Sequence, residues 1–124
     1  MKSIALCCAL LLASPAILQP VLAHEVKGPN GGAVVDAGAF HIELRVKDTA
    51  VDVFVTDAGE KPVTIGDAKG TAILIVDGKP ARVSLTAVSG NRLSGTAAAP
   101  LPPKPKGAVQ IQMPNGASLQ GKFL

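Results

Sequence analysis

The 124-residue chain contains no tryptophan and no tyrosine, and its only aromatic residues are Phe40, Phe54 and Phe123. Proteins that bind single-stranded nucleic acid or RNA bases stack those bases on aromatic side chains. The basic residues are scattered along the sequence, without the cluster that is typical of a nucleic-acid interface. These two features argue against nucleic acid as a partner.

Charge is also scarce, because charged residues make up 17% of the chain and the formal net charge is only +3. Disordered chains combine high net charge with few apolar residues, whereas 48% of this chain is hydrophobic. The 13 glycines and 10 prolines disfavour long helices. The composition therefore predicts a folded chain, and its length leaves room for one domain.

Long apolar runs are missing except for residues 4–12, which are too few to cross a bilayer, where a helix needs about 20 residues. Lys2 precedes this run, and the segment that ends at Ala23 has small residues at the positions that determine signal cleavage. We therefore interpret residues 1–23 as a secretory signal peptide. Cleavage after Ala16 is the alternative. The mature protein is expected in the periplasm or outside the cell, with no membrane span.

Both cysteines, Cys7 and Cys8, lie inside the predicted signal peptide. The exported chain, residues 24–124, would then have no thiol and could form neither a disulfide nor a thiolate metal site. We expect a single domain that is stabilised by its packed core. The chain also lacks the Gly-x-Ser-x-Gly motif of serine hydrolases, and we do not expect an enzyme.

Residues 40–47 and 50–57 alternate apolar and polar side chains with the period of two that is typical of half-buried strands. A two-residue loop joins them in a register that sets apolar residues against apolar residues and Arg45 against Asp52. In this register His41 lies on the polar, outer face of the hairpin.

Turn signals divide the rest of the chain into further short strands. An Asp-Gly pair at residues 77–78 and a Pro-Asn-Gly loop at residues 114–116 each predict a hairpin. The prolines of residues 99–107 indicate an extended crossover instead of a strand. Seven to nine strands predict an all-β antiparallel sandwich, immunoglobulin-like, with a small barrel as the alternative. The other expected strands are residues 33–36, 61–65, 71–76, 81–88, 92–97, 109–113 and 117–121.

Histidine is the best candidate for chemistry, because the chain has only His24 and His41. After cleavage at Ala23, His24 would be the first residue and could bind one ion through both its α-amine and its ring Nδ1. His41 can add a third nitrogen, and Glu25 or Glu43 an oxygen. Such a tetragonal set favours Cu(II) over Ni(II), Co(II) or Zn(II). The alternative is that His41 is only a solvated surface side chain.

Several short motifs follow one another in the order of residues 24–25, 28–32, 34–35, 40–44, 53–57, 61–63, 70–72 and 90–95. This order resembles small exported bacterial proteins associated with heavy-metal resistance, and a segment ahead of the main body of some periplasmic metal-efflux adaptor proteins. The resemblance implies a periplasmic β-sandwich in which His24, His41 and Glu43 match positions that meet a metal, with a metal-efflux component as partner. Two histidines that are common in that group are replaced here by Asn30 and Ala58.

The residues leave three functions open. The first is a metal-binding carrier or efflux accessory that uses the two histidines. The second is an adhesion or protein-interaction module whose exposed apolar surface includes Phe54, Ile73 and Ile75. The third, an oxidase with a copper ion held by histidine, is disfavoured by the small size of the chain.

Overall fold

The computed structural model describes residues 26–124, so the predicted signal peptide and the candidate ligands His24 and Glu25 lie outside the described residues. In residues 26–124 the chain forms strands and no helix, and therefore no helix there is able to cross a membrane. The strands are β1 Val26–Lys27, β2 Ala33–Ala37, β3 Phe40–Lys47, β4 Ala50–Asp57, β5 Lys69–Val76, β6 Lys79–Ser89, β7 Arg92–Thr96, β8 Lys106–Gln112 and β9 Ser118–Phe123.

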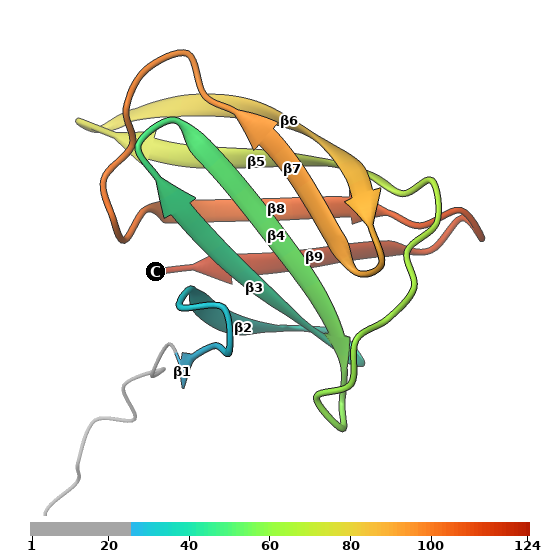
Figure 1. The fold of residues 1–124 in the computed structure, drawn as a ribbon. Helices are drawn as coiled ribbons and strands as arrows, with labels where there is room; N and C mark the ends of the chain where they lie inside the picture. Colours follow the sequence, from blue (N-terminus) through green and yellow to red (C-terminus); the bar gives the residue numbers. More distant parts are fainter. Residues whose placement is uncertain (1–25) are drawn as a thin grey trace, which may run out of the picture.

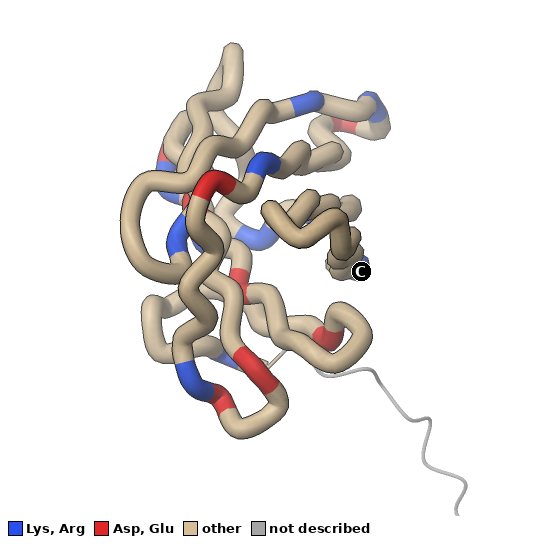
Figure 2. The backbone as a smooth tube through the Cα atoms, turned by 90° about the vertical axis from the view of Figure 1, so that its right-hand side faces the viewer, with Lys and Arg blue, Asp and Glu red and all other residues tan. Residues whose placement is uncertain are grey.

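These strands form one antiparallel sheet in the order β1-β2-β3-β4-β7-β6-β5-β8-β9. The sheet curls so that β9, at one edge, packs against β2, next to the other edge (Figure 1). Seen from the side, the backbone bends round a central core (Figure 2). The predicted all-β antiparallel class is confirmed, and the single curled sheet corresponds to its barrel-like alternative.

Most core side chains come from alternate strand positions that point inward, and a few, such as Ile65, come from loops. Apolar residues from every strand between β2 and β9 contribute to the core. The largest fully buried members are Phe123, Ile42, Ile65, Leu74, Leu85, Leu93 and Ile111. Burial of these side chains, in a part of the chain that has no cysteine, is the main source of its stability.

Two predicted hairpins are confirmed, the first of them also in its register. β3 and β4 pair so that Arg45 faces Asp52, as expected from the alternation. In the β5–β6 hairpin, Asp77 and Gly78 both have positive φ, of 51° and 77°, which is the conformation of a two-residue type I′ turn. This turn is tighter than the sequence suggested, because Lys79 already pairs with Val76.

The C-terminal hairpin has the predicted three-residue loop. Ile111 pairs with Leu119, and the Met113 amide donates a hydrogen bond of 2.8 Å to the Ala117 carbonyl. Gly116 has a φ of 88°, the left-handed conformation that this loop requires.

Two predictions about strands are wrong. Residues 61–65 form no strand but a loop with one bridge to β4, between Thr56 and Pro62. The crossover ends earlier than predicted, since Lys106 and Gly107 belong to β8 and pair with β5. The sequence also gave no sign of the two-residue strand β1.

Candidate functional site

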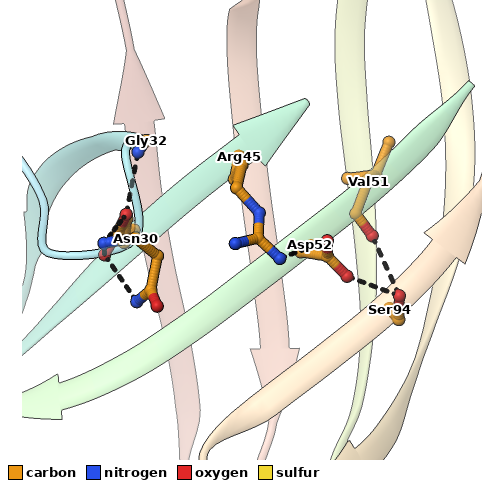
Figure 3. A network of polar contacts seen from close by, with 7 residues as sticks. Asn30, Gly32, Arg45, Val51, Asp52 and Ser94 are labelled. Carbon is orange, nitrogen blue, oxygen red and sulfur yellow. Dashed lines mark hydrogen bonds and ion pairs between the residues drawn. The ribbon is translucent and has the colours of Figure 1, made fainter. Parts of the chain in front are cut away.

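The turn between β1 and β2, which carries Asn30 and Gly32 (Figure 3), covers the carboxylate of Glu43 on the outer face of β3. The backbone amides of Asn30 and Gly32 donate hydrogen bonds of 3.0 Å and 2.8 Å to Oε2, and the Asn30 side-chain amide donates one of 3.1 Å to Oε1. Glu43 is only 4% exposed and is the one buried charged residue of the described chain. Its charge is therefore compensated by amide dipoles rather than by a cation.

The glycines of this turn are explained by its closeness to β3. A Cβ atom on Gly28 would lie 2.3 Å from the Glu43 carboxyl carbon. A Cβ atom on Gly32 would lie 2.3 Å from the Leu44 carbonyl oxygen, and Gly31 has a φ of 82°. Residues 28–32 were predicted to form a turn, and this prediction is confirmed. The glycines allow the turn to close over Glu43, and we call the turn, with its hydrogen bonds to Glu43, the clamp.

A second polar pair lies on the same outer face, where β2 and β3 pair with each other. Asp36 is the cross-strand partner of His41, and the His41 Nε2 atom lies 3.0 Å from the Asp36 Oδ1 atom. Asp36 is exposed and His41 is partly exposed, so that solvent reaches both groups. The prediction that His41 points outward is confirmed.

The structure gives different partners to two residues that the sequence placed at one site. Both oxygens of Glu43 accept hydrogen bonds from the turn, whereas His41 contacts Asp36. Among residues 26–124, no three histidine, cysteine, aspartate or glutamate side chains are grouped closely enough to hold a metal. His24 and Glu25 lie outside that range.

Asp36 was missed by the sequence reasoning. Its signal was present, because a strand at residues 33–36 and one at 40–47, joined through Gly38, predict a hairpin that sets Asp36 against His41. Gly38 has a φ of 63° in the turn of that hairpin. The register of β2 had simply not been worked out.

Beyond Glu43, the outer face of β3, β4 and β7 carries an ion pair (Figure 3). Arg45 Nη2 lies 2.9 Å from Asp52 Oδ2, and the Ser94 hydroxyl donates a hydrogen bond of 2.6 Å to Oδ1. Burial alone would raise the pKa of Asp52, but the hydrogen bonds from Ser94 and Arg45 and the charges of Arg45 and Arg92 outweigh it. The pKa of Asp52 is therefore lowered from its usual value.

The Arg45 guanidinium also lies over the Phe54 ring, 5.0 Å from its centroid. Phe54 is only 8% exposed, so the prediction that it forms part of an exposed apolar surface is wrong. Ile75, which was named with it, is 41% exposed.

A cavity of about 480 Å³ opens beside the turn, and residues of β1, β3, the proline-rich crossover and the end of β9 also line it. Its charged lining residues are Lys27, Arg45 and Lys104, and its apolar ones include Val46 and Phe123. The size lies in the range of small-molecule sites. The Asp36–His41 pair does not line it.

Comparisons with protein-family models, with curated proteins and with solved structures find no match. The resemblance to heavy-metal-resistance proteins accordingly stays a prediction from the motifs, and the site is argued from its own geometry.

Proposed function

We propose that this chain is an exported, non-enzymatic metal-binding protein that serves as a metal carrier or as an accessory of a metal-efflux system in the periplasm. The observation that supports it is the Asp36–His41 pair, whose oxygen and nitrogen lie 3.0 Å apart. Two ligands that bind one ion at right angles, each at about 2.0–2.1 Å, are separated by about 2.9 Å. The pair therefore fits one ion with little movement of the backbone.

The position of β1 beside β2 supports a role for His24 in the same site. Val26 pairs with Val34 and Lys27 with Ala33. His24 precedes Val26 by only two residues in the sequence, and β2 is the strand that carries Asp36. In the proposed site His24 supplies its imidazole and, as the first residue after cleavage, its α-amine. Three nitrogens and one carboxylate oxygen suit Cu(II) better than Ni(II), Co(II) or Zn(II).

Glu43 has a supporting role in this proposal. Its hydrogen bonds hold the turn of residues 28–32, and this turn directs β1 along β2. Glu25, one residue from His24 in the sequence, can supply a further oxygen. The ligands of the proposed site are therefore His24, Asp36 and His41, with Glu25 as an additional oxygen donor and Glu43 as the residue that positions the turn ahead of β2.

The first test measures Cu(II) affinity of the purified exported protein by competition with a chelator. His41→Ala should weaken binding at least tenfold, because an imidazole nitrogen is lost, and Asp36→Asn should weaken it as well. Asp48→Asn is the matched control, since Asp48 is an exposed acid in a turn whose φ of 55° asparagine tolerates. Equal affinity of the wild type and His41→Ala, with both folded, would refute the site.

The second test isolates the α-amine. A form that begins with Met ahead of His24 replaces the free amine by an amide, which is a poor ligand. Loss of one such ligand is worth about 3 kcal/mol, which corresponds to an affinity about a hundredfold lower. Mass spectrometry must first establish that the exported protein begins at residue 24. Equal affinity of the two forms would exclude the amine and leave an imidazole site alone.

A further inference from the structure

The outer face of β6, β5, β8 and β9 carries no acidic side chain among its outward positions. These strands lie side by side in that order (Figure 1). Every second residue of each strand turns outward, and the pairing aligns these residues in rows across the four strands. The nearest acidic residue along the chain is Asp77, in the turn beyond the last row.

One end of this face combines apolar and cationic residues. Ile75 pairs with Pro80 on one side and with Lys106 on the other. In the next row Ile73 pairs with Arg82 and Ala108, and Ala108 pairs with Lys122. Leu124, which follows β9 at the same end, is 79% exposed. We name Ile73, Ile75, Arg82, Lys106, Lys122 and Leu124 the amphipathic patch.

The other end of the same face is different. Its outward residues are mainly serine, threonine and glutamine, together with the exposed Val88, and Lys69 is its only charge. The chain as a whole has a formal net charge of only +3. The positive charge of the patch therefore comes from the placement of its residues and not from a generally basic surface.

From this placement we propose that the amphipathic patch docks on the surface of a bilayer that contains anionic phospholipids. Negatively charged headgroups attract lysine and arginine, whose apolar stems can lie along Ile73 and Ile75 while their charges reach the phosphates. Ile75 is an exposed side chain that can enter the boundary between headgroups and acyl chains. This proposal does not depend on the metal site.

A lipid surface fits the patch better than a protein partner. The buried centres of protein interfaces are rich in tyrosine, tryptophan and phenylalanine and poor in lysine. The patch has two lysines and no aromatic residue. Its four strands present alternate side chains on the convex side of the curled sheet, which suits a broad surface rather than an inserted segment.

The test is co-sedimentation with vesicles of phosphatidylglycerol and phosphatidylcholine, compared with vesicles of phosphatidylcholine alone. The wild type and every variant are prepared as the exported protein, with the same N-terminus. Each cation near an anionic surface contributes about a factor of five, so Arg82→Gln/Lys106→Gln/Lys122→Gln should bind the anionic vesicles about a hundredfold more weakly at low salt. The matched control is Lys47→Gln/Lys61→Gln/Lys69→Gln, which removes the same charge from outside the patch and should change binding much less.

All of these positions are exposed, so the urea midpoints of both triple variants should match that of the wild type. In a protein that keeps all three cationic residues of the patch, Ile75→Ser should also weaken binding to the anionic vesicles. Three results would overturn the proposal. They are an absence of preference for the anionic vesicles, an equal loss in both triple variants, and capture of an acidic protein by a wild type that does not bind the vesicles.

Discussion

Two carboxylates on one face of the sheet differ in burial and in bonding partners because their surroundings differ. Glu43 and Asp52 both point outward from paired strands. Glu43 is covered by a turn and bonded to amides, whereas Asp52 lies beside Arg45 and Ser94. The strand pattern placed both residues on the polar face, but it could not show that one of them is buried.

The lowered pKa of Asp52 makes stability depend on pH. In an unfolded chain an aspartate titrates near about pH 3.9. Because the folded pKa is lower, the contribution of Asp52 is fully present above that value and is lost as pH falls through the folded pKa. We expect the urea midpoint of the wild type to decline more steeply below about pH 4 than that of Asp52→Asn. Asp67→Asn serves as a control, and equal slopes for Asp52→Asn and the wild type would contradict the prediction.

At the scale of elements, the turn of residues 28–32 is shaped by a strand that follows it in the chain. Its glycines make room for the Glu43 carboxylate and the Leu44 carbonyl. A turn here was predictable from glycine and proline alone, because these residues favour turns wherever they occur. Its contact with β3 was not, because it depends on where the finished hairpin brings Glu43.

The clamp can be tested by a double-mutant cycle. Gly28→Ala places a Cβ 2.3 Å from the Glu43 carboxyl carbon and should lower the free energy of unfolding by about 1–3 kcal/mol. In a Glu43→Ala background the same change should cost much less, because the carboxylate is gone. Urea unfolding measures both. Gly59→Ala is the control, since its nearest neighbour would be at an ordinary 3.4 Å. An equal cost in both backgrounds would show that the clash is not with Glu43.

The local elements were the part of this protein that its sequence predicted well. Alternation fixed the β3–β4 register, and Asp-Gly and Pro-Asn-Gly fixed two turns, because each depends on neighbouring residues only. The Asp36–His41 pair could have been predicted by the same reasoning. The burial of Glu43 and of Phe54 could not, because it depends on what the finished fold lays over them. The turn of residues 28–32 covers Glu43, and the Arg45 guanidinium lies over the Phe54 ring.

At the scale of the molecule, the curled sheet closes without a continuous ladder. β9 packs on β2, but no backbone pairing joins them anywhere in the described part of the chain. The close approach depends on Gly121, where a Cβ would lie 2.8 Å from the Val35 Cγ2 atom. Side-chain packing therefore holds this seam together.

We expect Gly121→Ala to lower the free energy of unfolding by about 1–3 kcal/mol, since the branched Val35 side chain has little freedom to move. Adding Val35→Ala should restore part of the loss and give a favourable coupling energy. Urea unfolding of the two single variants and the double variant measures this coupling. If the two free-energy changes simply add, the structure relaxes elsewhere in the contact between β2 and β9. Gly121 would then not determine the distance between these strands.

The order of strands in the sheet also determines how the chain can assemble in time. β3 and β4 are neighbours in sequence and can form their hairpin early, but the other edge of β4, from Ala50 to Phe54, is covered by β7 alone within residues 26–124. Until residues 92–96 arrive, Ala50 to Phe54 present unpaired amides and carbonyls beside apolar side chains. An open edge of this kind can pair with another unfinished copy. Aggregation should therefore compete with folding most strongly in fragments that end before β7.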